Sequence, residues 1–558
     1  MSPAATVTAH IRAHAPAMTG GIIDYPRLLG GDLPMLDLYD SRAHRGSVAG
    51  SDLADRVAVR AGALAARGLG RGDRVVMVAT NDVEYLATLL AVLLLGAVPC
   101  AVAPPPTPSR PESAGVQHLR AAIRVLDPAM VLCSDRTVPA AEHPGAVAIE
   151  DLVGAQVFPM PHDRPAPQPD DIHHVQLTSG STSDPKAVVL THRNVVDNLG
   201  VLAHAMRVER GRDRMFSWLP TYHDMGLIQV LGALLYGLPL GWMTPLGFLR
   251  DPLSWVRHMS SHRSTVTAAP TFAYRSAAEA LARAADADGI DLSAVRYAFV
   301  GAEPIPASVL GLFADGFAPL GFRPDALVPC YGMAESVLAT TLAFGGVRTR
   351  AVDGEHAPMV SCGPPVDGMR IAVVDPDGVE VPAGVVGDIR IAGPSVFAGY
   401  RHPDGTIARP RGGWHDTGDR GLLWDGELFV VGRSKEMLIV RGRNLPPYDV
   451  ERVIGEIPGV GYGQSVVCAV RDDRNGAERI VAVVATARTD TGTRGGLPAE
   501  VRTRVREVFG FTLDDVVLVG KSAIPRTTSG KIQRLRVSQF VKTGECEPIA
   551  RQNVGIRA

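Results

Sequence analysis

The sequence lacks the usual marks of metal-binding, disulfide-bonded and nucleic-acid-binding proteins. Its six cysteines lie far apart, with no C-x-x-C pair and no cluster of histidines. This spacing indicates neither a zinc site nor a disulfide framework and favours buried free thiols. The formal net charge is only -2, so no general field would draw the chain to nucleic acid or to an anionic membrane surface. Any anion-binding site must therefore be local.

Targeting and membrane-spanning segments are also absent from the pattern. The first residues lack a basic start followed by an apolar run, which predicts no signal peptide and, together with free thiols, a cytoplasmic location. The apolar run at 86–103 contains Gly96 and Pro99 and is short for a membrane span. We interpret it as a buried helix that leads into a strand, and we expect no membrane span.

The order of the remaining patterns predicts an α/β fold. The chain has 558 residues, of which 46% are apolar and 20% charged, as in globular proteins of about three to four compact units. A helix is predicted over 51–70 with Ser51 as its N-cap, followed by a strand over 73–79 and a helix and strand within 86–102. The segments VTAAP, YAFVGAE and ALVPCYG each predict a strand that ends in a small-residue turn, where α/β sheets present ligands.

Two further regions have different patterns. Residues 361–429 show short strands with Gly and Pro turns (RIAVVDPDG, GDIRIAG, GELFVVG), which predict a β-rich subdomain. After Arg433 a smaller α/β unit is predicted, with strands in VVCAVR and IVAVVAT. The Pro-rich stretch VFPMPHDRPAPQPDD before Ile172 is interpreted as a linker.

The stretch QLTSGSTSDPK at 176–186 has the composition of an anion-binding loop. Small residues let the backbone approach an anion, hydroxyl and N–H groups act as donors, and one lysine supplies a charge. It is not the common G-x-x-x-x-G-K-[ST] loop, because Asp184 and Pro185 precede the lysine. A plain surface turn remains the alternative. The candidate phosphate-binding residues are Thr178, Ser179, Gly180, Ser181, Thr182 and Lys186.

Three more motifs offer groups for nucleotide or carboxylate chemistry. In WLPTYHDMG, His223 could orient a substrate carboxylate or shield it from water, although a lone histidine beside a turn can also be structural. YGMAE follows a strand and is predicted to open a helix; Tyr331 could stack on adenine and Glu335 could hold Mg²⁺. HDTGD ends in Asp419, which could accept both ribose hydroxyls, the alternative being an Asp-rich turn.

The last two motifs are basic. GRSKEMLIVRGRN begins beside Arg433, at the predicted boundary before the smaller unit, and could equally be a solvated linker. PRTTSGKIQR places Lys531 on a Ser-Gly turn, where a lysine could also be a simple surface charge.

Taken together, in this order and at these spacings, the motifs resemble the adenylate-forming superfamily, which includes acyl-CoA synthetases, luciferases and the adenylation domains of peptide synthetases. The resemblance runs from about Ser51 to Arg534. Within it, YHDMGLI, VGAEPI, YGMAES, VSCGPP and GRSKEMLIVRGRNLPPYDVE are most similar to the fatty acyl-AMP ligases. Those enzymes hand activated acyl groups to carrier proteins.

The resemblance implies a fold and a set of site residues. It implies a large N-terminal domain (1–432) of two α/β sheets and a β-barrel subdomain, followed by a small mobile α/β domain (433–558). Residues 178–186 would hold the departing pyrophosphate, and Lys531 would reach the reacting groups during adenylation. The other implied residues are Gly301, Ala302, Glu303, Tyr331, Gly332 and, within the same motif, Met333 and Ala334 for the nucleotide; Glu335 for Mg²⁺; Asp419, with Arg433 nearby, for the ribose; His223 for the acyl carboxylate; and Lys435 for the hinge.

The implied reaction uses ATP and Mg²⁺ to activate a fatty or related carboxylic acid and then transfers it to an acyl carrier protein. Ala334, where most acyl-CoA synthetases have threonine, favours this branch, whereas the short segment 344–360 leaves CoA open as the acceptor. Asp224 keeps an amino-acid substrate as a lesser alternative. A non-catalytic binding protein would be expected to have lost Lys531, Glu335 or Asp419. The apolar segments 230–249 and 271–280 could line an acyl tunnel or belong to the core.

Overall fold

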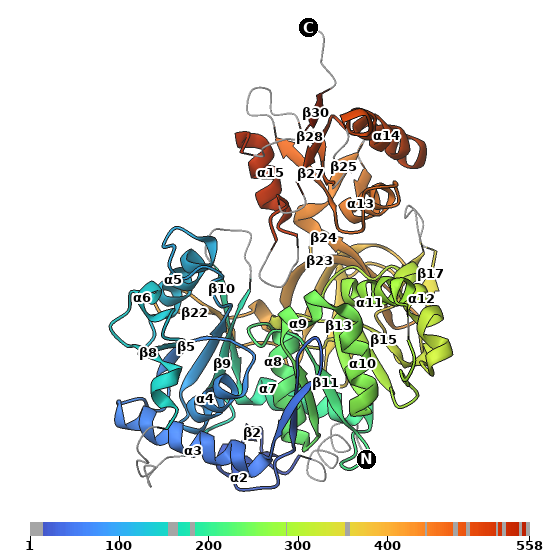
Figure 1. The fold of residues 1–558 in the computed structure, drawn as a ribbon. Helices are drawn as coiled ribbons and strands as arrows, with labels where there is room; N and C mark the ends of the chain where they lie inside the picture. The colour runs from blue at the N-terminus through green and yellow to red at the C-terminus, as the bar shows by residue number, and fades with distance from the viewer. Residues whose placement is uncertain are drawn as a thin grey trace.

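The computed structural model shows a large lower part and a smaller C-terminal unit above it (Figure 1). It describes residues 15–154, 166–178, 185–285, 287–351, 358–440, 443–471, 478–486, 491–520, 523–526, 532–545 and 550–553. The stretch interpreted as a linker therefore lies mostly outside the described residues.

The largest sheet in the described chain supplies the floor of the candidate site. Its strands run in the order β16-β15-β14-β13-β11-β12-β3-β4 and are parallel except at the two edges. The predicted strands in VTAAP, YAFVGAE and ALVPCYG are confirmed as β13, β14 and β15. The strands are β3 (Leu36–Tyr39), β4 (His44–Val48), β11 (Met215–Ser217), β12 (Leu240–Met243), β13 (Val266–Pro270), β14 (Tyr297–Gly301), β15 (Leu327–Tyr331) and β16 (Thr341–Leu342).

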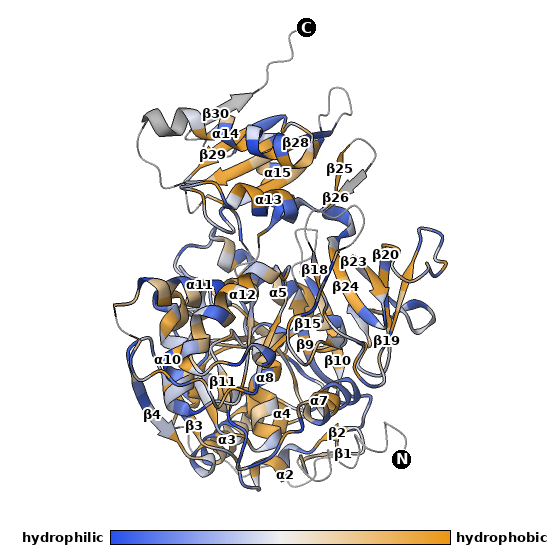
Figure 2. Ribbon diagram, turned by 90° about the vertical axis from the view of Figure 1, so that its right-hand side faces the viewer, coloured by the Kyte–Doolittle hydropathy of each residue, from blue (hydrophilic) through white to orange (hydrophobic). Residues whose placement is uncertain are grey.

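A second sheet region faces the first across a layer of helices. It combines the parallel order β6-β5-β7-β8 with the antiparallel order β22-β21-β10-β9, and β6 lies beside β9. Figure 2 shows hydrophobic residues in β10, where every residue after Lys186 is buried, as expected of a strand covered on both faces. The strands are β5 (Arg74–Val78), β6 (Val98–Val102), β7 (Met130–Cys133), β8 (Ala146–Ala148), β9 (Ile172–Thr178), β10 (Lys186–Thr191), β21 (Gly399–Arg401) and β22 (Ile407–Ala408).

Helices fill the space between the sheets and cover their outer faces. Side chains of α3, α4, α7 and α8 join both sheets in one core, whereas α10, α11 and α12 pack on the other face of the large sheet. The helices are α2 (Tyr25–Leu29), α3 (Gly50–Ala66), α4 (Val83–Leu94), α5 (Ala114–Leu126), α6 (Val138–Ala141), α7 (His192–Met206), α8 (Asp224–Tyr236), α9 (Pro245–Arg250), α10 (Pro252–His262), α11 (Thr271–Arg283) and α12 (Ala307–Phe317).

The first predicted helix is present, but its predicted cap is wrong. Helix α3 begins at Gly50, with Ala49 as its N-cap, so Ser51 lies inside the first turn. A Cβ on Gly50 would lie 2.2 Å from the carbonyl oxygen of Leu33. Close packing of the backbone, rather than a side-chain cap, therefore determines where this helix begins. The helix and strand predicted within 86–102 are confirmed as α4 and β6.

A β-rich region and the smaller unit complete the fold. The antiparallel order β19-β20-β23-β24 confirms the predicted β-rich subdomain, and β27-β28-β29-β30 with α13, α14 and α15 forms the C-terminal unit. The elements are β1 (Met18–Thr19), β2 (Ile22–Ile23), β17 (Thr349–Arg350), β18 (Met359–Val360), β19 (Arg370–Val374), β20 (Gly387–Ala392), β23 (His415–Trp424), β24 (Glu427–Arg433), β25 (Leu438–Val440), β26 (Arg443–Leu445), α13 (Pro447–Gly455), β27 (Ser465–Arg471), β28 (Glu478–Ala485), α14 (Thr491–Phe509), β29 (Asp515–Val519), α15 (Arg534–Thr543) and β30 (Ala550–Asn553).

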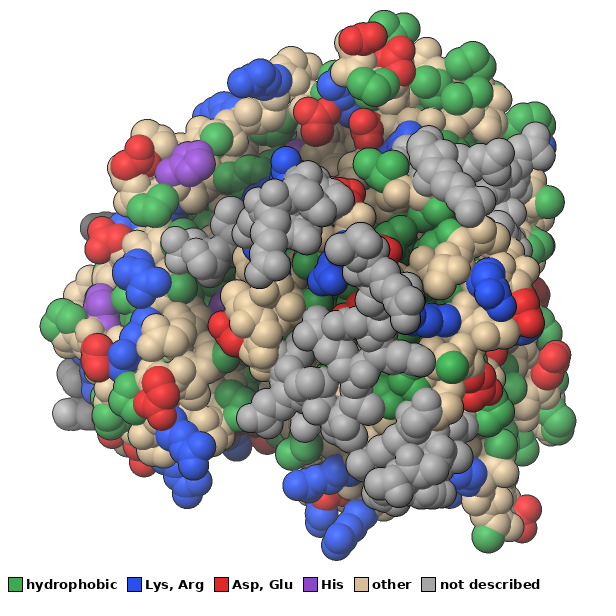
Figure 3. Space-filling view, turned by 90° about the horizontal axis from the view of Figure 1, so that it is seen from above, with side chains coloured by type: hydrophobic (Ala, Val, Ile, Leu, Met, Phe, Trp, Pro, Cys, Tyr) green, Lys and Arg blue, Asp and Glu red, His purple; other side chains and the backbone are tan. Residues whose placement is uncertain are grey.

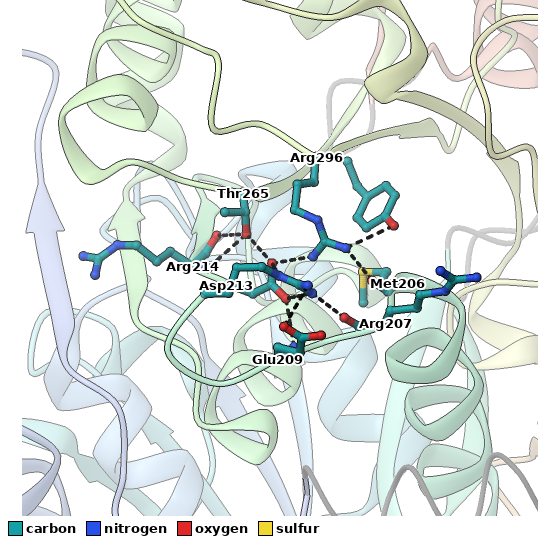
Figure 4. A network of polar contacts seen from close by, with 9 residues as sticks. Met206, Arg207, Glu209, Asp213, Arg214, Thr265 and Arg296 are labelled. Carbon is teal, nitrogen blue, oxygen red and sulfur yellow. Dashed lines mark hydrogen bonds and ion pairs between the residues drawn. The ribbon is translucent and has the colours of Figure 1, made fainter.

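A buried carboxylate ties the end of α7 to the starts of β13 and β14 (Figure 4). Asp213, which is 0% exposed, accepts hydrogen bonds from Arg296 Nη1 at 2.6 Å, Arg212 Nη2 at 2.8 Å and Thr265 Oγ1 at 3.0 Å. Arg296 Nη2 also donates to the carbonyl of Met206 at 3.1 Å. Burial raises the pKa of the Asp213 carboxyl, but these donors outweigh it and leave the pKa below its usual value. The network fixes the amino-terminal edge of the sheet, opposite the candidate site.

The charge distribution on the surface and the state of the cysteines can both be compared with the sequence. Acidic and basic side chains are intermixed over the coloured part of the face in Figure 3. The five cysteines in the described ranges form no disulfide with one another, and all but the half-buried Cys330 are buried; Cys546 lies outside those ranges. In the part of the chain that the structure describes, no helix is long and apolar enough to cross a membrane.

Candidate functional site

One continuous cavity of about 3150 Å³ lies above the carboxyl ends of the parallel strands and reaches the C-terminal unit. Every described residue of the predicted site lines it except Gly301. Ser179, Gly180, Ser181, Thr182 and Lys531 lie outside the described residues. The structure therefore brings together groups that are up to about 260 residues apart in the sequence, from Thr178 to Lys435.

The predicted anion loop is the connection of a β-hairpin. Thr178 ends β9, Lys186 begins β10, and the two residues are paired in register across the antiparallel ladder. The Nζ atom of Lys186 lies 4.8 Å from the ring centroid of Tyr400, on the neighbouring strand β21. A cation over an aromatic face is attracted by the ring quadrupole. This contact holds the lysine beside the cavity.

Glu335 is oriented by the same tyrosine. The hydroxyl of Tyr400 donates to Glu335 Oε1 at 2.6 Å, and the backbone N–H of Phe397 donates to the carbonyl of Glu335 at 2.9 Å. The predicted helix after Tyr331 is wrong: Glu335 sits in the short 3₁₀ turn Ala334–Ser336. A Cβ on Gly332 would lie 1.7 Å from the carbonyl oxygen of Leu338, so the chain folds back on itself here.

Asp419 is a buried carboxylate with two partners. It is 7% exposed, its Oδ2 accepts a hydrogen bond from the Tyr331 hydroxyl at 2.8 Å, and its Oδ1 lies 3.4 Å from Arg433 Nε. Burial raises the pKa of the Asp419 carboxyl above its usual value, while Arg433 and the Tyr331 hydroxyl oppose the rise. The alternative of an Asp-rich turn is wrong, because Asp419 pairs with Arg433 between β23 and β24.

The turn after β14 forms one wall of the same space. A Cβ on Gly301 would lie 2.9 Å from Cys330 Sγ, and Ala302 adopts a φ of 67°, which is unusual for a residue with a side chain. Glu303 Oε1 accepts a hydrogen bond from the backbone N–H of Phe272 at 2.5 Å. These contacts fix the turn at the end of the strand, where an α/β fold presents ligands.

The segment before α8 carries His223. It is the residue at the N-cap position, with its ring centroid 4.8 Å from that of Tyr222. Gln176 Nε2 donates to the carbonyl of Tyr222 at 2.7 Å, which ties this segment to β9. A second histidine, His415, lies near Tyr400, with its ring centroid 6.1 Å from that of Tyr400. Burial lowers the pKa of the His415 imidazole.

Beyond His223 the cavity continues between α7, α8 and the large sheet. We call this part the inner arm; it is lined by Leu199, Leu202, Met215, Ile228, Gly232, Tyr236 and Val266. The segment 230–249 contributes to both: Gly232 and Tyr236 line the arm, Tyr236 is also part of the core, and Val230 and Leu231 belong to the core without lining the cavity. In the segment 271–280, Phe272 and Ser276 line the cavity and Ala277 lies in the core.

Lys435 lies in the 3₁₀ turn Ser434–Glu436, directly after β24. Arg534, at the start of α15, is 3.2 Å from Glu436 through its Nε and also bridges Glu451 of α13. The Arg275 guanidinium of α11 lies 4.8 Å from the ring centroid of Tyr462 in the C-terminal unit. The cation–π contact therefore joins the two parts across the cavity, whereas the Arg534 ion pairs lie within the C-terminal part.

Sequence reasoning did not find the partners that orient these groups. Tyr400, Phe272 and the pairing role of Gln176 have no local motif, because each acts on a residue that is distant in the sequence. The spacing between Tyr400 and Glu335 is 65 residues. Tyr400 is brought to this place by the antiparallel pairing of β21 with β10, which neither local motif predicts.

The comparisons with known proteins agree with this geometry. Residues 39–401 match the model of the AMP-binding enzyme family, and residues 449–531 match its C-terminal domain. A Mycobacterium tuberculosis protein with the name "putative ligase" is 34% identical over 86% of this chain and 92% of its own length. The 4-hydroxyphenylalkanoate adenylyltransferase of the same organism is 33% identical over 83% of this chain and 81% of its own.

The solved structures agree as well. A structure from a study of fatty acyl-adenylate ligases of E. coli and L. pneumophila has a TM-score of 0.84 and 29% identity, covering 93% of this chain and 97% of that one. The mainly parallel sheet with acidic and basic groups at its carboxyl edge defines an α/β protein whose site lies where such folds bind ligands. The chain belongs to the AMP-binding enzyme family and is an adenylate-forming ligase, with fatty acyl-adenylate ligases among the structures that it resembles.

Proposed function

We propose that this enzyme activates a fatty or related carboxylic acid with ATP to form an acyl adenylate, and then transfers the acyl group to the phosphopantetheine thiol of an acyl carrier protein. One observation carries the proposal: Lys186, Glu335 and the Tyr331–Asp419–Arg433 group line a single cavity that continues into an apolar inner arm. The polar part suits a nucleotide, and the arm suits an acyl chain.

The residues suit the nucleotide as follows. Asp419, aligned by Tyr331, would accept the ribose hydroxyls, and the turn at Gly301–Glu303 with Tyr331–Ala334 would enclose the adenine. The hairpin loop 178–186 would hold the pyrophosphate. Mg²⁺ is commonly held by one or two carboxylates together with substrate phosphates, and Glu335, oriented by Tyr400, fits this role. When bound, the cation would neutralise charge on the phosphates. No group of three or more His, Cys, Asp or Glu side chains forms a metal site in the described ranges.

The reaction needs positive charge rather than a base. A carboxylic acid is already ionised at pH 7, so it can attack the α-phosphorus of ATP directly. Two anions must then meet in line, and negative charge grows on the phosphoryl oxygens. We propose that Lys531 stabilises this charge and that His223 lies beside the acyl carboxylate. We also place the domain boundary between residues 432 and 433, with Lys435 as the hinge about which residues 433–558 turn before transfer.

The role of Lys531 can be tested by replacing it with alanine. Loss of a positioned cation raises the activation free energy by about 3 kcal/mol or more, which lowers the rate at least about a hundredfold. Acid-dependent pyrophosphate release should therefore fall by that factor across a panel of carboxylic acids, with the thermal unfolding unchanged. The matched control is Lys542→Ala on the exposed surface of α15, which should retain activity. Near-normal release by Lys531→Ala would contradict the assignment.

The acceptor is the second part of the proposal. The similarity to fatty acyl-adenylate ligases across nearly the whole chain supports a carrier protein. The segment between Phe344 and Val360 is short, and its described ends form the β17–β18 pair; this favours free CoA as the rival acceptor. A cytoplasmic location stays a prediction.

A further inference from the structure

A glutamine interrupts the apolar surroundings of the inner arm. Gln229, in the second turn of α8, is 7% exposed and lines the cavity. Its Oε1 atom has no hydrogen-bond partner among the described residues. A buried acceptor without a donor is costly, so such an atom in a ligand-binding cavity points to a donor on the ligand.

The orientation of the Gln229 amide follows from its neighbour. Nε2 donates to the carbonyl of Ala268 on β13, at 3.4 Å. A carbonyl can only accept, so the amide NH₂ must face the strand and Oε1 must be the other terminal atom. The atom without a partner is therefore an acceptor, and it needs a hydroxyl or N–H group opposite it.

The neighbouring residues of the arm do not supply this donor. Leu199, Ile228 and Gly232 have no side-chain hydrogen-bond donor, and the Tyr236 hydroxyl already donates to the carbonyl of Leu199 at 2.5 Å. An ammonium group would be poorly placed beside these uncharged side chains, because burying an unpaired charge costs far more than burying a hydroxyl. A neutral donor on the substrate fits best.

The position of Gln229 on α8 sets where this donor would lie. Helix α8 begins directly after His223, and six residues at about 1.5 Å each place Gln229 about 9 Å further along the helix. Gly232 follows one turn later and also lines the cavity. We propose that Gln229 is a specificity-determining residue that accepts a hydrogen bond from a hydroxyl group on the acyl substrate, well away from its carboxylate. This inference rests on the proposed function.

Matched pairs of acids would test it. The wild type and the Gln229→Met variant, which is unbranched and of similar length but lacks the amide, would be compared by acid-dependent pyrophosphate release. One pair is a fatty acid with and without a hydroxyl remote from the carboxylate; the other is a 4-hydroxyphenylalkanoic acid and its phenyl analogue. The two pairs distinguish an aliphatic hydroxyl from a phenol.

In the wild type we expect kcat/KM to be about ten- to a hundredfold higher for the hydroxylated member of at least one pair. In Gln229→Met this ratio should fall to about one or below, because only the hydroxylated acid loses a hydrogen-bond acceptor. Gln229→Leu also lacks the amide and should lower the ratio in the same way. Agreement between the two variants would show that the effect does not come from the packing of methionine. Equal rates within both pairs in the wild type, or an equal loss for both members in the variants, would overturn the inference alone. Absence of pyrophosphate release with every acid would overturn the proposed function as well.

Discussion

The hydrogen bond between Tyr331 and Asp419 gives the sharpest test of the proposed ribose site. Tyr331→Phe removes a donor 2.8 Å from a carboxylate that is 7% exposed. Hydrogen bonds to charged groups contribute about 1.5–3 kcal/mol. Because this bond is already formed without nucleotide, its removal also affects the unbound protein, and we use the lower end of the range. ATP should then bind about tenfold more weakly, a difference of about 1.4 kcal/mol.

The loss should also grow as the pH falls. The Tyr331 hydroxyl lowers the pKa of the Asp419 carboxyl, which burial has raised, so the variant should protonate this carboxyl at a higher pH. Calorimetric titration with a non-hydrolysable ATP analogue at several pH values would measure both effects. Tyr274→Phe is the matched control, since Tyr274 does not line the cavity and its buried hydroxyl donates to the carbonyl of Phe299 at 2.9 Å. Unchanged ATP affinity in a folded Tyr331→Phe protein would refute the ribose role of Asp419.

Three other predictions follow from the site. Tyr400→Phe removes the donor that orients Glu335, and we expect the Mg²⁺ concentration for half-maximal pyrophosphate release to rise about tenfold; no change would exclude Glu335 as the ligand. ATP affinity of the wild type should fall as the pH drops through the raised pKa of Asp419, since only the ionised carboxylate accepts both ribose hydroxyls. Arg433→Gln should move this loss of affinity to higher pH, because Arg433 lowers the pKa of Asp419. A titration with the same midpoint in both proteins would contradict this. A Cβ at Gly232 would already lie 3.3 Å from a ring carbon of Tyr236, so Gly232→Val should reduce kcat/KM for long acids relative to short ones by about tenfold or more, and an unaltered chain-length profile would show that the arm holds no acyl chain.

Local patterns were sufficient for the elements but not for their ends. The strands β13, β14 and β15 were predictable because each is an apolar run that stops at small residues. The start of α3 was not, because it depends on the contact of Gly50 with the backbone of Leu33. The 3₁₀ turn at Glu335 was also missed, since the close approach of Gly332 to Leu338 stops a helix from forming.

The site shows the same limit. Its charged residues could be proposed from motifs, because charged side chains beside small-residue turns are visible in the sequence. The groups that orient them could not: Tyr400 reaches Glu335 only through the pairing of β21 with β10. Gln229 also carries no motif, and its significance depends on burial without a partner for Oε1 among the described residues.

The most direct test of the proposed function is the identity of the acylated product. The enzyme would be supplied with ATP, Mg²⁺ and an acid that supports pyrophosphate release, together with either CoA or a holo acyl carrier protein, and the products would be weighed by mass spectrometry. We expect an acyl adenylate without acceptor and an acylated carrier protein with the holo carrier, with little acyl-CoA. Rapid formation of acyl-CoA with an unmodified carrier would contradict the account.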